Sequence, residues 1–479
     1  MVLSDDSMDQ MERLSNYILS GLILRCTKVV TLSHTLREKT HQLQTHIRVK
    51  RVGEWLDRYS NLQHLTINSY YPRTRLVEQL LAITESLSRE NCEKLRTIRT
   101  AGYDDNQYYI YNTQPILPIM KACKNLELLQ ANMELSADDI SELSALPTFS
   151  ALAANPNRMR VRQRESLPQY EIVQAHLPDC IKLYFDGAIQ VHSQEGVSSL
   201  LSIRCLRRVY LAIHSDVSIN AEYIEDLAID NISNMRVSIT APNLTHLLLG
   251  SHVVGTVSAP RLSVLTVCGL ARHERLSLIN SLPSLTSLRL TYCKTEILSQ
   301  LKCPSLTCLT ISPEPPCHVD VSKLPSTLKS LTVETECSCT GFSKTTLVSV
   351  SVQSHVYEPL PATLTCLDAM EVDPIHLIDC KYLKSLHCDV LPECTTPWPD
   401  SIRVLSLVNT SSKWPSIPLP RALRSLIVTD DECSVERNLL PDHWDLSHLS
   451  DLELYACVPT EKQKNEFRGE YTGEYRYAT

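Results

Sequence analysis

Apolar residues recur along this chain of 479 residues in the pattern apolar-x-x-apolar-x-apolar, in which the positions marked x are mostly polar. The pattern extends from about residue 62 to residue 454 and is most regular after residue 200. Its clearest copies are Leu244/Leu247/Leu249, Leu285/Leu288/Leu290, Leu306/Leu309/Ile311 and Leu328/Leu331/Val333. Further copies begin at Leu206, Ile224, Leu262, Leu347, Leu364, Leu383, Ile402, Leu423 and Leu449, so that successive starts lie 17 to 26 residues apart. This period predicts a repeat protein with one short strand in each turn.

The spacing within a copy has a physical meaning. Its second and third apolar positions are two residues apart, so on a strand both side chains point to the same face. The first apolar residue enters the core from the preceding loop. A single turn cannot bury this apolar edge alone, so stability requires many stacked turns. The chain is therefore predicted to be an α/β solenoid of about 18 turns with a curved parallel sheet.

On these residues the chain resembles the leucine-rich-repeat family over nearly its whole length. It departs from the family at the ninth repeat position, where the family has Asn. Cys293 is one of the few matches, whereas other turns have Leu270, Glu314, His355 or Asp431 there. The resemblance implies the solenoid fold without the family's buried amide ladder, and we expect water or backbone groups to bind the turn carbonyls instead.

Four turns have Pro three residues before the first apolar position, at Pro325, Pro361, Pro399 and Pro420. They resemble the short Leu-Pro-x-x-Leu repeats of bacterial effectors and FNIP-type proteins. Pro fixes φ and favours an extended approach to the strand. With about 20 residues per turn, residues 206–460 are predicted to form thin turns with extended or 3₁₀ segments on the convex side.

Longer turns precede this region. Starts at Leu62, Leu95, Leu126, Phe149 and Cys180 are 23 to 33 residues apart, which leaves room for helices behind the sheet in residues 57–205. Apolar residues from Leu76 to Leu87 have helical spacing, and Ser136 has the character of a helix cap. Residues 461–479 are predicted to be a closing cap or, preferably, a flexible tail.

Residues 1–56 are predicted to be a mostly helical amino-terminal cap. Within them Tyr17-Ile-Leu-Ser20, Leu24-Arg-Cys26 and Leu32-Ser-His-Thr-Leu-Arg37 resemble the middle and end of an F-box. That resemblance implies an adaptor that joins a bound protein to Skp1 and a cullin ubiquitin ligase. The segment lacks the Leu-Pro opening of the motif, and Leu36 replaces its Trp.

The formal charge of −8 comes from 54 acidic and 46 basic residues distributed along the chain. This favours solubility and argues against a nucleic-acid partner. The only concentrated basic feature in the sequence is Arg158, Arg160, Arg162 and Arg164, which an extended segment would place on one side. They are candidates for contact with an anionic partner, with a solvated edge as the alternative.

The first 30 residues lack the order of a signal peptide, and no apolar run reaches 18 residues. We therefore expect no membrane partner. The 18 cysteines are scattered, without paired zinc-site spacing, and are expected to be reduced thiols in the cytoplasm or nucleus.

Motifs for catalysis, phosphate loops and metal binding are absent from the sequence, so we expect a non-enzyme with no cofactor or metal site. The residue between the second and third apolar positions should project from the concave sheet face. Along the regular turns these residues are mainly hydroxylic. The few charged or aromatic ones nearby form the candidate partner site: Arg289, Asp368, His387, Glu453 and Tyr455. The predicted function is a scaffold that binds a protein or peptide, with the adaptor and a structural subunit of a large assembly as alternatives.

Overall fold

The computed structural model describes residues 2–3, 29–34, 63–69, 87–102, 122–131, 137–154, 177–231, 235–251, 254–269, 273–372, 374–389, 396–409, 417–430, 438–455, 457–458, 460, 462–463, 467 and 470–474. The chain forms two compact units, unit 1 (Met1–Leu244) and unit 2 (Thr245–Thr479). Both consist of stacked turns, and each turn contributes a strand to a parallel sheet.

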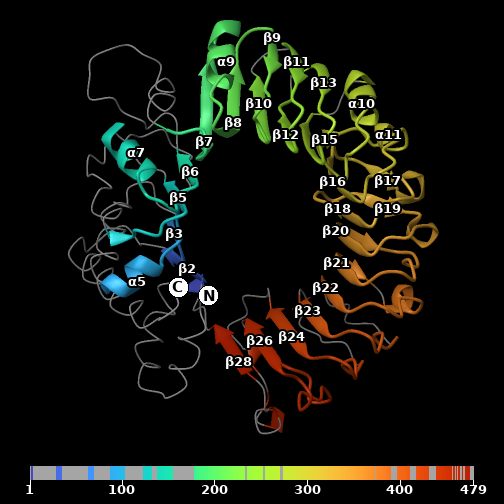
Figure 1. Cartoon of the computed structure of the whole chain (residues 1–479). Coiled ribbons are helices and arrows are strands. Elements are labelled where there is room, and N and C mark those ends of the chain that lie inside the picture. Colours follow the sequence, from blue (N-terminus) through green and yellow to red (C-terminus); the bar gives the residue numbers. More distant parts are fainter. Residues whose placement is uncertain are drawn as a thin grey trace, which may run out of the picture. The chain divides into compact units, whose positions relative to one another are not determined.

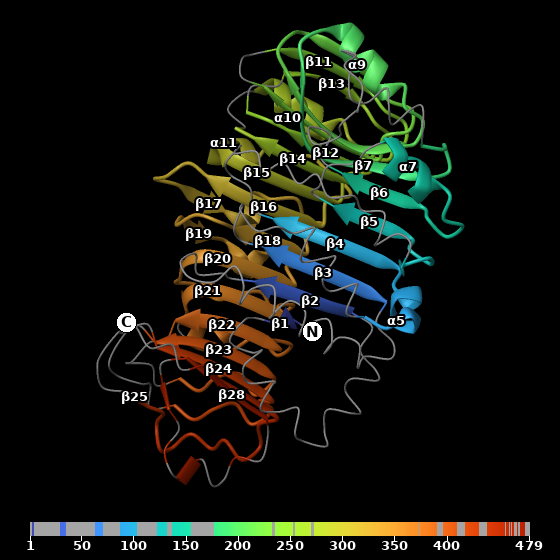
Figure 2. The same ribbon diagram turned by 90° about the vertical axis from the view of Figure 1, so that its left-hand side faces the viewer.

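Unit 1 is built on parallel strands that pair in sequence order (Figure 2). The strands are β1 (Val2–Leu3), β2 (Val29–His34), β3 (His64–Ser69), β4 (Thr97–Gly102), β5 (Leu128–Ala131), β6 (Ala151–Ala154), β7 (Lys182–Val191), β8 (Leu206–Ile213) and β10 (Asp226–Asn231). A register shift within β7 places Tyr184 beside Arg208.

Unit 2 continues the same plan in shorter turns. Its strands are β12 (His246–Leu249), β14 (Val264–Cys268), β15 (Ser287–Cys293), β16 (Cys308–Pro313), β18 (Ser330–Val333), β20 (Ser349–Val356), β21 (Cys366–Val372), β22 (Ser385–Asp389), β23 (Val404–Asn409), β24 (Ser425–Asp430), β26 (Asp451–Tyr455) and β28 (Glu470–Glu474). Within this unit they follow an arc, with the sheet on its concave side (Figure 1). Every neighbouring pair is parallel.

The repeated apolar positions form the core of each unit. In the turn that contains β15, Leu285, Leu288 and Leu290 are at most 1% exposed, and the equivalent residues of the other described regular turns are also buried. Full burial of such a side chain contributes about 1.5–3 kcal/mol, so the repeated leucines supply the main stabilising term. The predicted α/β leucine-rich-repeat solenoid is confirmed.

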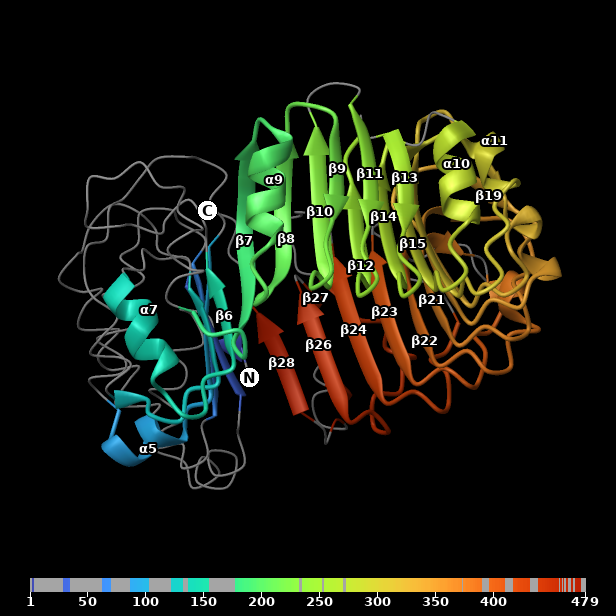
Figure 3. The same ribbon diagram turned by 45° about the horizontal axis from the view of Figure 1, so that its top comes forward.

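The outer side of the turns changes along the chain. In unit 1 it has α5 (Arg89–Lys94), α7 (Ala137–Ser144) and α9 (Gln194–Leu201), of which α9 lies beside β7 and β8 (Figure 3). It then continues with the short strands β9 (Val217–Asn220) and β11 (Arg236–Thr240), which pair in parallel.

In unit 2 the outer side is mostly thin, as predicted. It consists of β13 (Val254–Ser258), β17 (His318–Asp320), β19 (Ser338–Thr340), β25 (Asn438–Leu439), β27 (Cys457–Val458) and the 3₁₀ helices η2 (Val321–Lys323), η3 (Phe342–Lys344) and η4 (Pro374–Leu377). The expected absence of α-helices after residue 205 is wrong for two turns, because α10 (His273–Asn280) and α11 (Thr295–Leu298) occupy them. α10 lies in the 23-residue turn from Leu262 to Leu285, and α11 lies in the 21-residue turn from Leu285 to Leu306.

Hydroxyl side chains bind main-chain carbonyls of the preceding turn where the strands begin. Ser284, Ser305 and Thr327, each just before the first apolar position, donate to main-chain oxygens of the preceding turn at 2.8, 2.9 and 2.7 Å. Thr286 and Thr307, just after that position, donate to the oxygen of the equivalent residue one turn earlier at 3.1 and 3.2 Å. Ser and Thr therefore form two ladders of hydrogen bonds where the strands begin, and the expected replacement at the ninth position stays a prediction.

The Pro residues of the short turns begin a tight turn. The carbonyls of Pro325, Pro361, Pro399 and Pro420 each accept a hydrogen bond from the backbone N–H three residues later, at 3.0 to 3.2 Å. That N–H belongs to the first apolar residue of the turn. Pro thus presets the backbone that brings this residue into the core.

Both ends of the chain differ from expectation. Residues 29–34 form β2, which pairs with β3, where a mostly helical segment was predicted. Residues 470–474 form β28, which pairs with β26, where a flexible tail was preferred. The unpaired edges of β3 and β26 would each template another strand, and this pairing outweighs weak local sequence signals. With these strands, 21 of the described strands belong to the repeat sheet, more than the predicted 18 or so turns.

Candidate functional site

The predicted concave-face positions of unit 2 align across its strands as one row, called here the central row. The pairing register links its members directly, each to the next. In order they are Leu248, Thr266, Arg289, Thr310, Thr332, Ser351, Asp368, His387, Ser406, Ile427 and Glu453. Neighbouring strands are about 4.8 Å apart, so the row extends on the order of 50 Å.

Arg289 lies in β15 and is held by an acidic residue two strands away. Its guanidinium is 2.8 Å from a carboxylate oxygen of Glu334, just after β18, and the Ser312 hydroxyl of the intervening strand donates to the same carboxylate at 2.9 Å. About half of the Arg289 side chain is exposed. The three residues form a fixed, solvent-facing polar group, in which charges of opposite sign lie side by side.

Asp368 and His387 lie next to each other at the middle of the row. Ser351 donates to the Asp368 carboxylate at 2.9 Å, and Nδ1 of His387 is 2.7 Å from the Ser406 hydroxyl. Nε2 of His387 is 4.0 Å from Asp368, which joins four adjacent strands in one polar chain. The Asp368 and His387 side chains are 53% and 48% exposed.

The residue types Ser406, His387 and Asp368 are those of a hydrolytic triad, but their arrangement differs from one. The Asp–His distance exceeds a hydrogen bond, and the half-exposed side chains lie on an open strand face. What this group offers is a set of hydrogen-bond donors and acceptors at regular spacing. Such a set can bind the main chain or polar side chains of another molecule.

The predicted site residues do not converge on one patch. Asp368 and His387 are neighbours, whereas Arg289 lies four strands before Asp368, at about 19 Å. Glu453 lies three strands after His387, and Tyr455 is at the carboxyl end of the same strand as Glu453. The candidate residues of the central row therefore share one face but are spread along it, and their role as a partner site stays a prediction. Arg158, Arg160, Arg162 and Arg164 lie outside the described residues.

Exposed apolar residues next to the row were missed in the sequence. Met370 follows Asp368 by two residues on β21 and is 41% exposed, so it projects from the same face. Tyr292 is 69% exposed and has φ of 51° at the register shift between β15 and β16. A positive φ is unusual for an aromatic residue. The two-residue period identifies Met370 from sequence, but nothing in the pattern signals the bulge that exposes Tyr292.

Unit 1 has an aromatic and charged cluster on β7, β8 and β10. The Arg208 guanidinium is 2.6 Å from the Asp226 carboxylate and 5.7 Å from the centre of the Tyr184 ring. Tyr210 donates to Asp230 at 3.2 Å. The cluster was not predicted because its aromatic residue, Tyr184, reaches Arg208 only through the register shift in β7.

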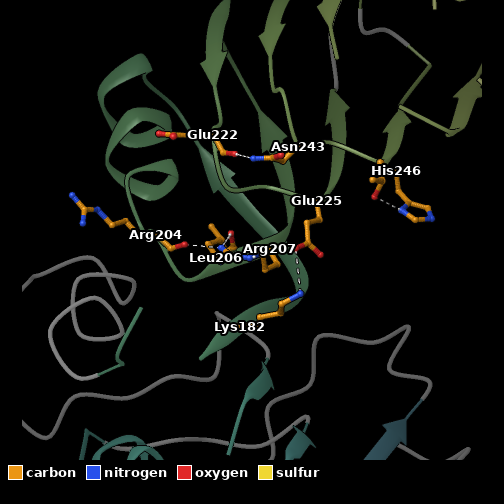
Figure 4. Close-up of polar contacts among 9 residues, drawn as sticks. Lys182, Arg204, Leu206, Arg207, Glu222, Glu225, Asn243 and His246 are labelled. Atoms are coloured by element: carbon orange, nitrogen blue, oxygen red, sulfur yellow. Dashed lines mark hydrogen bonds and ion pairs between the residues drawn. The ribbon is translucent and has the colours of Figure 1, made fainter. Parts of the chain in front are cut away.

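A second row lies where the strands begin. It consists of the residue just after the first apolar position of each turn, and we call it the entry row. In unit 1 its charges are paired. Glu225 is 3.4 Å from Lys182 and 3.5 Å from Arg207, and Arg207 also donates to the carbonyl of Arg204 (Figure 4). Arg96 and Glu127 form another pair at 3.1 Å.

In unit 2 the entry row contains three consecutive cations, Lys384, Arg403 and Arg424. A run of basic residues such as 158–164 is visible in the sequence, whereas this row is not. These residues are separated by about 20 positions in the sequence and become neighbours only when the turns stack.

Within the described part of the chain, no group of three or more His, Cys, Asp or Glu side chains could hold a metal ion. Several of the described cysteines are free thiols in the core. Burial raises the pKa of Cys205 and Cys380 from the ordinary 9.0 to about 11, and that of Cys293 to about 12. These thiols are therefore neutral at physiological pH and act as small apolar side chains.

Comparisons with known proteins give little further information. No protein-family description matches the sequence, and no curated protein matches it. Twelve chains of solved structures match the fold. One of them is in the crystal structure of a TLR13–ssRNA13 complex: it is 12% identical, the match covers 83% of this chain and 74% of that chain, and the TM-score is 0.42. The fold assignment therefore rests on this chain's own repeat pattern and strand register. Among the described helices, none is long and apolar enough to cross a membrane.

Proposed function

We propose that this chain is a non-enzymatic scaffold that binds a protein or peptide on the concave face of unit 2. The observation that supports this proposal is the in-register central row, in which hydroxyl groups alternate with a few half-exposed charged residues. A mainly neutral, hydrogen-bonding face of this kind suits a polypeptide better than a polyanion.

Binding is expected to centre on Asp368 and His387. Their polar atoms face solvent, and Met370 provides exposed apolar area two residues along the same strand. Binding energy usually comes from a few residues that combine apolar burial with hydrogen bonds. The ion-paired Arg289 would contribute less, because a partner must compete with Glu334 for its guanidinium.

A photo-crosslinking experiment tests the proposal. A photoreactive phenylalanine is placed at Ser351 or Ser406 in the full chain, and crosslinked products from native cells are identified by mass spectrometry. Lys344, an exposed residue of η3 on the outer side, is the matched control position. We expect a defined polypeptide to crosslink at both concave positions and not at Lys344. The double substitution Asp368→Ala/His387→Ala should remove it. Equal crosslinking from Lys344, or products unchanged by the double substitution, would contradict the proposal.

The identity of the captured proteins separates the scaffold from its alternatives. An adaptor would recover Skp1 and cullin through residues 11–40, and deletion of residues 1–50 would abolish that recovery. β2 occupies part of the segment that the F-box resemblance would make helical, so we propose the scaffold in preference. A structural subunit would crosslink to several proteins of one large assembly. We expect a fluorescent fusion of the chain to be found in the cytoplasm or nucleus, because these compartments keep its many thiols reduced.

A further inference from the structure

The entry row is continuous in unit 2 because each of its residues binds its neighbour through the backbone. The amide of Arg403 donates to the carbonyl of Lys384 at 2.8 Å, and the amide of Arg424 donates to the carbonyl of Arg403 at 2.8 Å. The three residues therefore lie in neighbouring turns, each immediately before its strand, about 4.8 Å from one to the next. All three side chains are exposed.

Elsewhere the charges of the same row are paired. In unit 1 the neighbouring cations Lys182 and Arg207 both lie close to the Glu225 carboxylate of the following turn, at 3.4 and 3.5 Å (Figure 4). In several turns of unit 2 the position is Ser or Thr, whose hydroxyl binds the preceding turn; these residues are Ser263, Thr286, Thr307 and Thr365. Both arrangements stabilise the stack without charge repulsion.

Lys384, Arg403 and Arg424 follow neither arrangement. Among the described residues no carboxylate lies within 4.0 Å of them, and none of the three makes a side-chain hydrogen bond. Like charges on directly opposed strand positions destabilise a sheet. Three adjacent turns thus place like charges side by side, and no described carboxylate or hydroxyl group relieves their repulsion.

We propose that Lys384, Arg403 and Arg424 form a binding surface for an acidic segment of a partner protein. Three evenly spaced cations match a run of carboxylates. Each cation would bind one carboxylate at the end of the sheet where the strands begin. Tyr382, which is 66% exposed and lies two residues before Lys384, adds an amphipathic ring that suits a polypeptide. This surface is separate from the central row and does not depend on the function proposed for it.

A protein partner is favoured over a nucleic acid by the extent of the charge. Tight binding of a nucleic acid depends on many phosphate contacts, and this row supplies three cations on a chain whose net charge is −8. Asp400 also interrupts the basic residues on the preceding loops, between Lys381 and Arg421. A partner with few, well-placed carboxylates tolerates such an interruption better than a continuous polyanion does.

The test measures binding of a fluorescent oligoglutamate peptide to the full chain by anisotropy at low salt. The variant Lys384→Thr/Arg403→Thr/Arg424→Thr introduces the residue that the row already has at several other turns, so the fold is expected to persist. We expect its affinity to fall about tenfold or more, because three exposed ion pairs are lost. The variant should also be at least as resistant to heat as the parent chain, since the repulsion is removed.

Two controls make the outcome decisive. Lys329→Thr changes a cation of the same row that donates to Thr346 at 3.3 Å and has no cationic neighbour, and binding should be unchanged. The charge-preserving variant Lys384→Arg/Arg403→Lys/Arg424→Lys should bind like the parent chain. No binding of oligoglutamate, equal binding by the Thr variant, or tighter binding of a single-stranded oligonucleotide of equal charge would each overturn the proposal.

Discussion

Hydroxyl groups link neighbouring turns, and Thr327 illustrates their contribution. Its side chain donates to the Leu306 carbonyl of the preceding turn at 2.7 Å. Thr327→Val keeps the shape and leaves that carbonyl without this donor, so the free energy of unfolding should fall by about 1 kcal/mol. Urea unfolding measures it. Thr332→Val, on the open face of β18, is the control and should change stability little; an equal loss in both would show that the ladder is unimportant.

Gly341 has a backbone conformation that other residues rarely adopt. Its φ is 84°, and an added Cβ would lie 2.8 Å from Oδ1 of Asp320 and 2.9 Å from the backbone nitrogen of Ser322 in the neighbouring turn. Gly341→Ala should therefore destabilise the chain by about 1–3 kcal/mol, through both strain and steric contact. Thermal unfolding followed by circular dichroism measures the loss. Gly196→Ala, with ordinary φ and a nearest contact of 3.3 Å, should be much milder.

At the residue scale, the sequence predicts the face to which a side chain points better than it predicts the residue that the side chain contacts. The central row follows from the two-residue period of strands, and every described pairing in it agrees. The ion pair of Arg289 with Glu334 does not follow, because 45 residues separate them and the side chain must span an intervening strand. Residue partnerships across turns depend on register and rotamer, which the pattern does not determine.

Helix α9 offers a test at the scale of an element. Its cap, Ser193, accepts a hydrogen bond from the Gly196 amide at 3.2 Å, and Val197 and Leu200 bury the helix against the turn. Ser193→Ala should lower the free energy of unfolding by about 1 kcal/mol, because that amide loses its acceptor. Ser199→Ala, inside the helix, should leave stability unchanged or raise it. Hydrogen exchange within residues 194–201 should accelerate only in the cap variant; equal rates would show that packing alone maintains α9.

Elements follow the sequence where a strong period repeats and depart from it where the signal is local. The strands of the regular turns lie where the leucine pattern predicts them, and α7 begins at Ala137, next to its predicted start. β2 and β28 were missed, since short strands at the ends of a stack form mainly because a neighbour's edge is available. α10 was missed because the average turn length of about 20 residues hid its 23-residue turn.

At the scale of the molecule, stacking creates features that no window of sequence contains. Lys384, Arg403 and Arg424 are ordinary single charges in the chain and a continuous basic row in the fold. Equivalent positions in other turns mostly have paired charges or hydroxyl groups, and these three residues differ from them. A repeat alignment guided by register could have located this row from sequence, whereas a scan for charge runs selects Arg158–Arg164 instead.

Buried thiols couple the stability of the whole molecule to pH. Burial raises the pKa of Cys205 and Cys380 to about 11 and that of Cys293 to about 12, above the ordinary value of 9.0. Between these values the folded chain retains protons that the unfolded chain releases, so the unfolded state binds fewer protons and stability falls as pH rises. The stabilisation is fully present below about pH 9 and is lost progressively from pH 9 to about pH 12.

Urea unfolding under reducing conditions at pH 8, 9 and 10 measures this dependence. We expect the midpoint to fall little from pH 8 to 9 and more steeply from pH 9 to 10. Lys and Tyr residues titrate in the same range, so the decisive comparison is with the triple variant Cys205→Ala/Cys293→Ala/Cys380→Ala. That variant should be less stable at pH 8, because it loses buried volume, and should decline less steeply above pH 9. If both proteins decline in parallel, the thiols do not govern alkaline stability, and the titration of surface groups does.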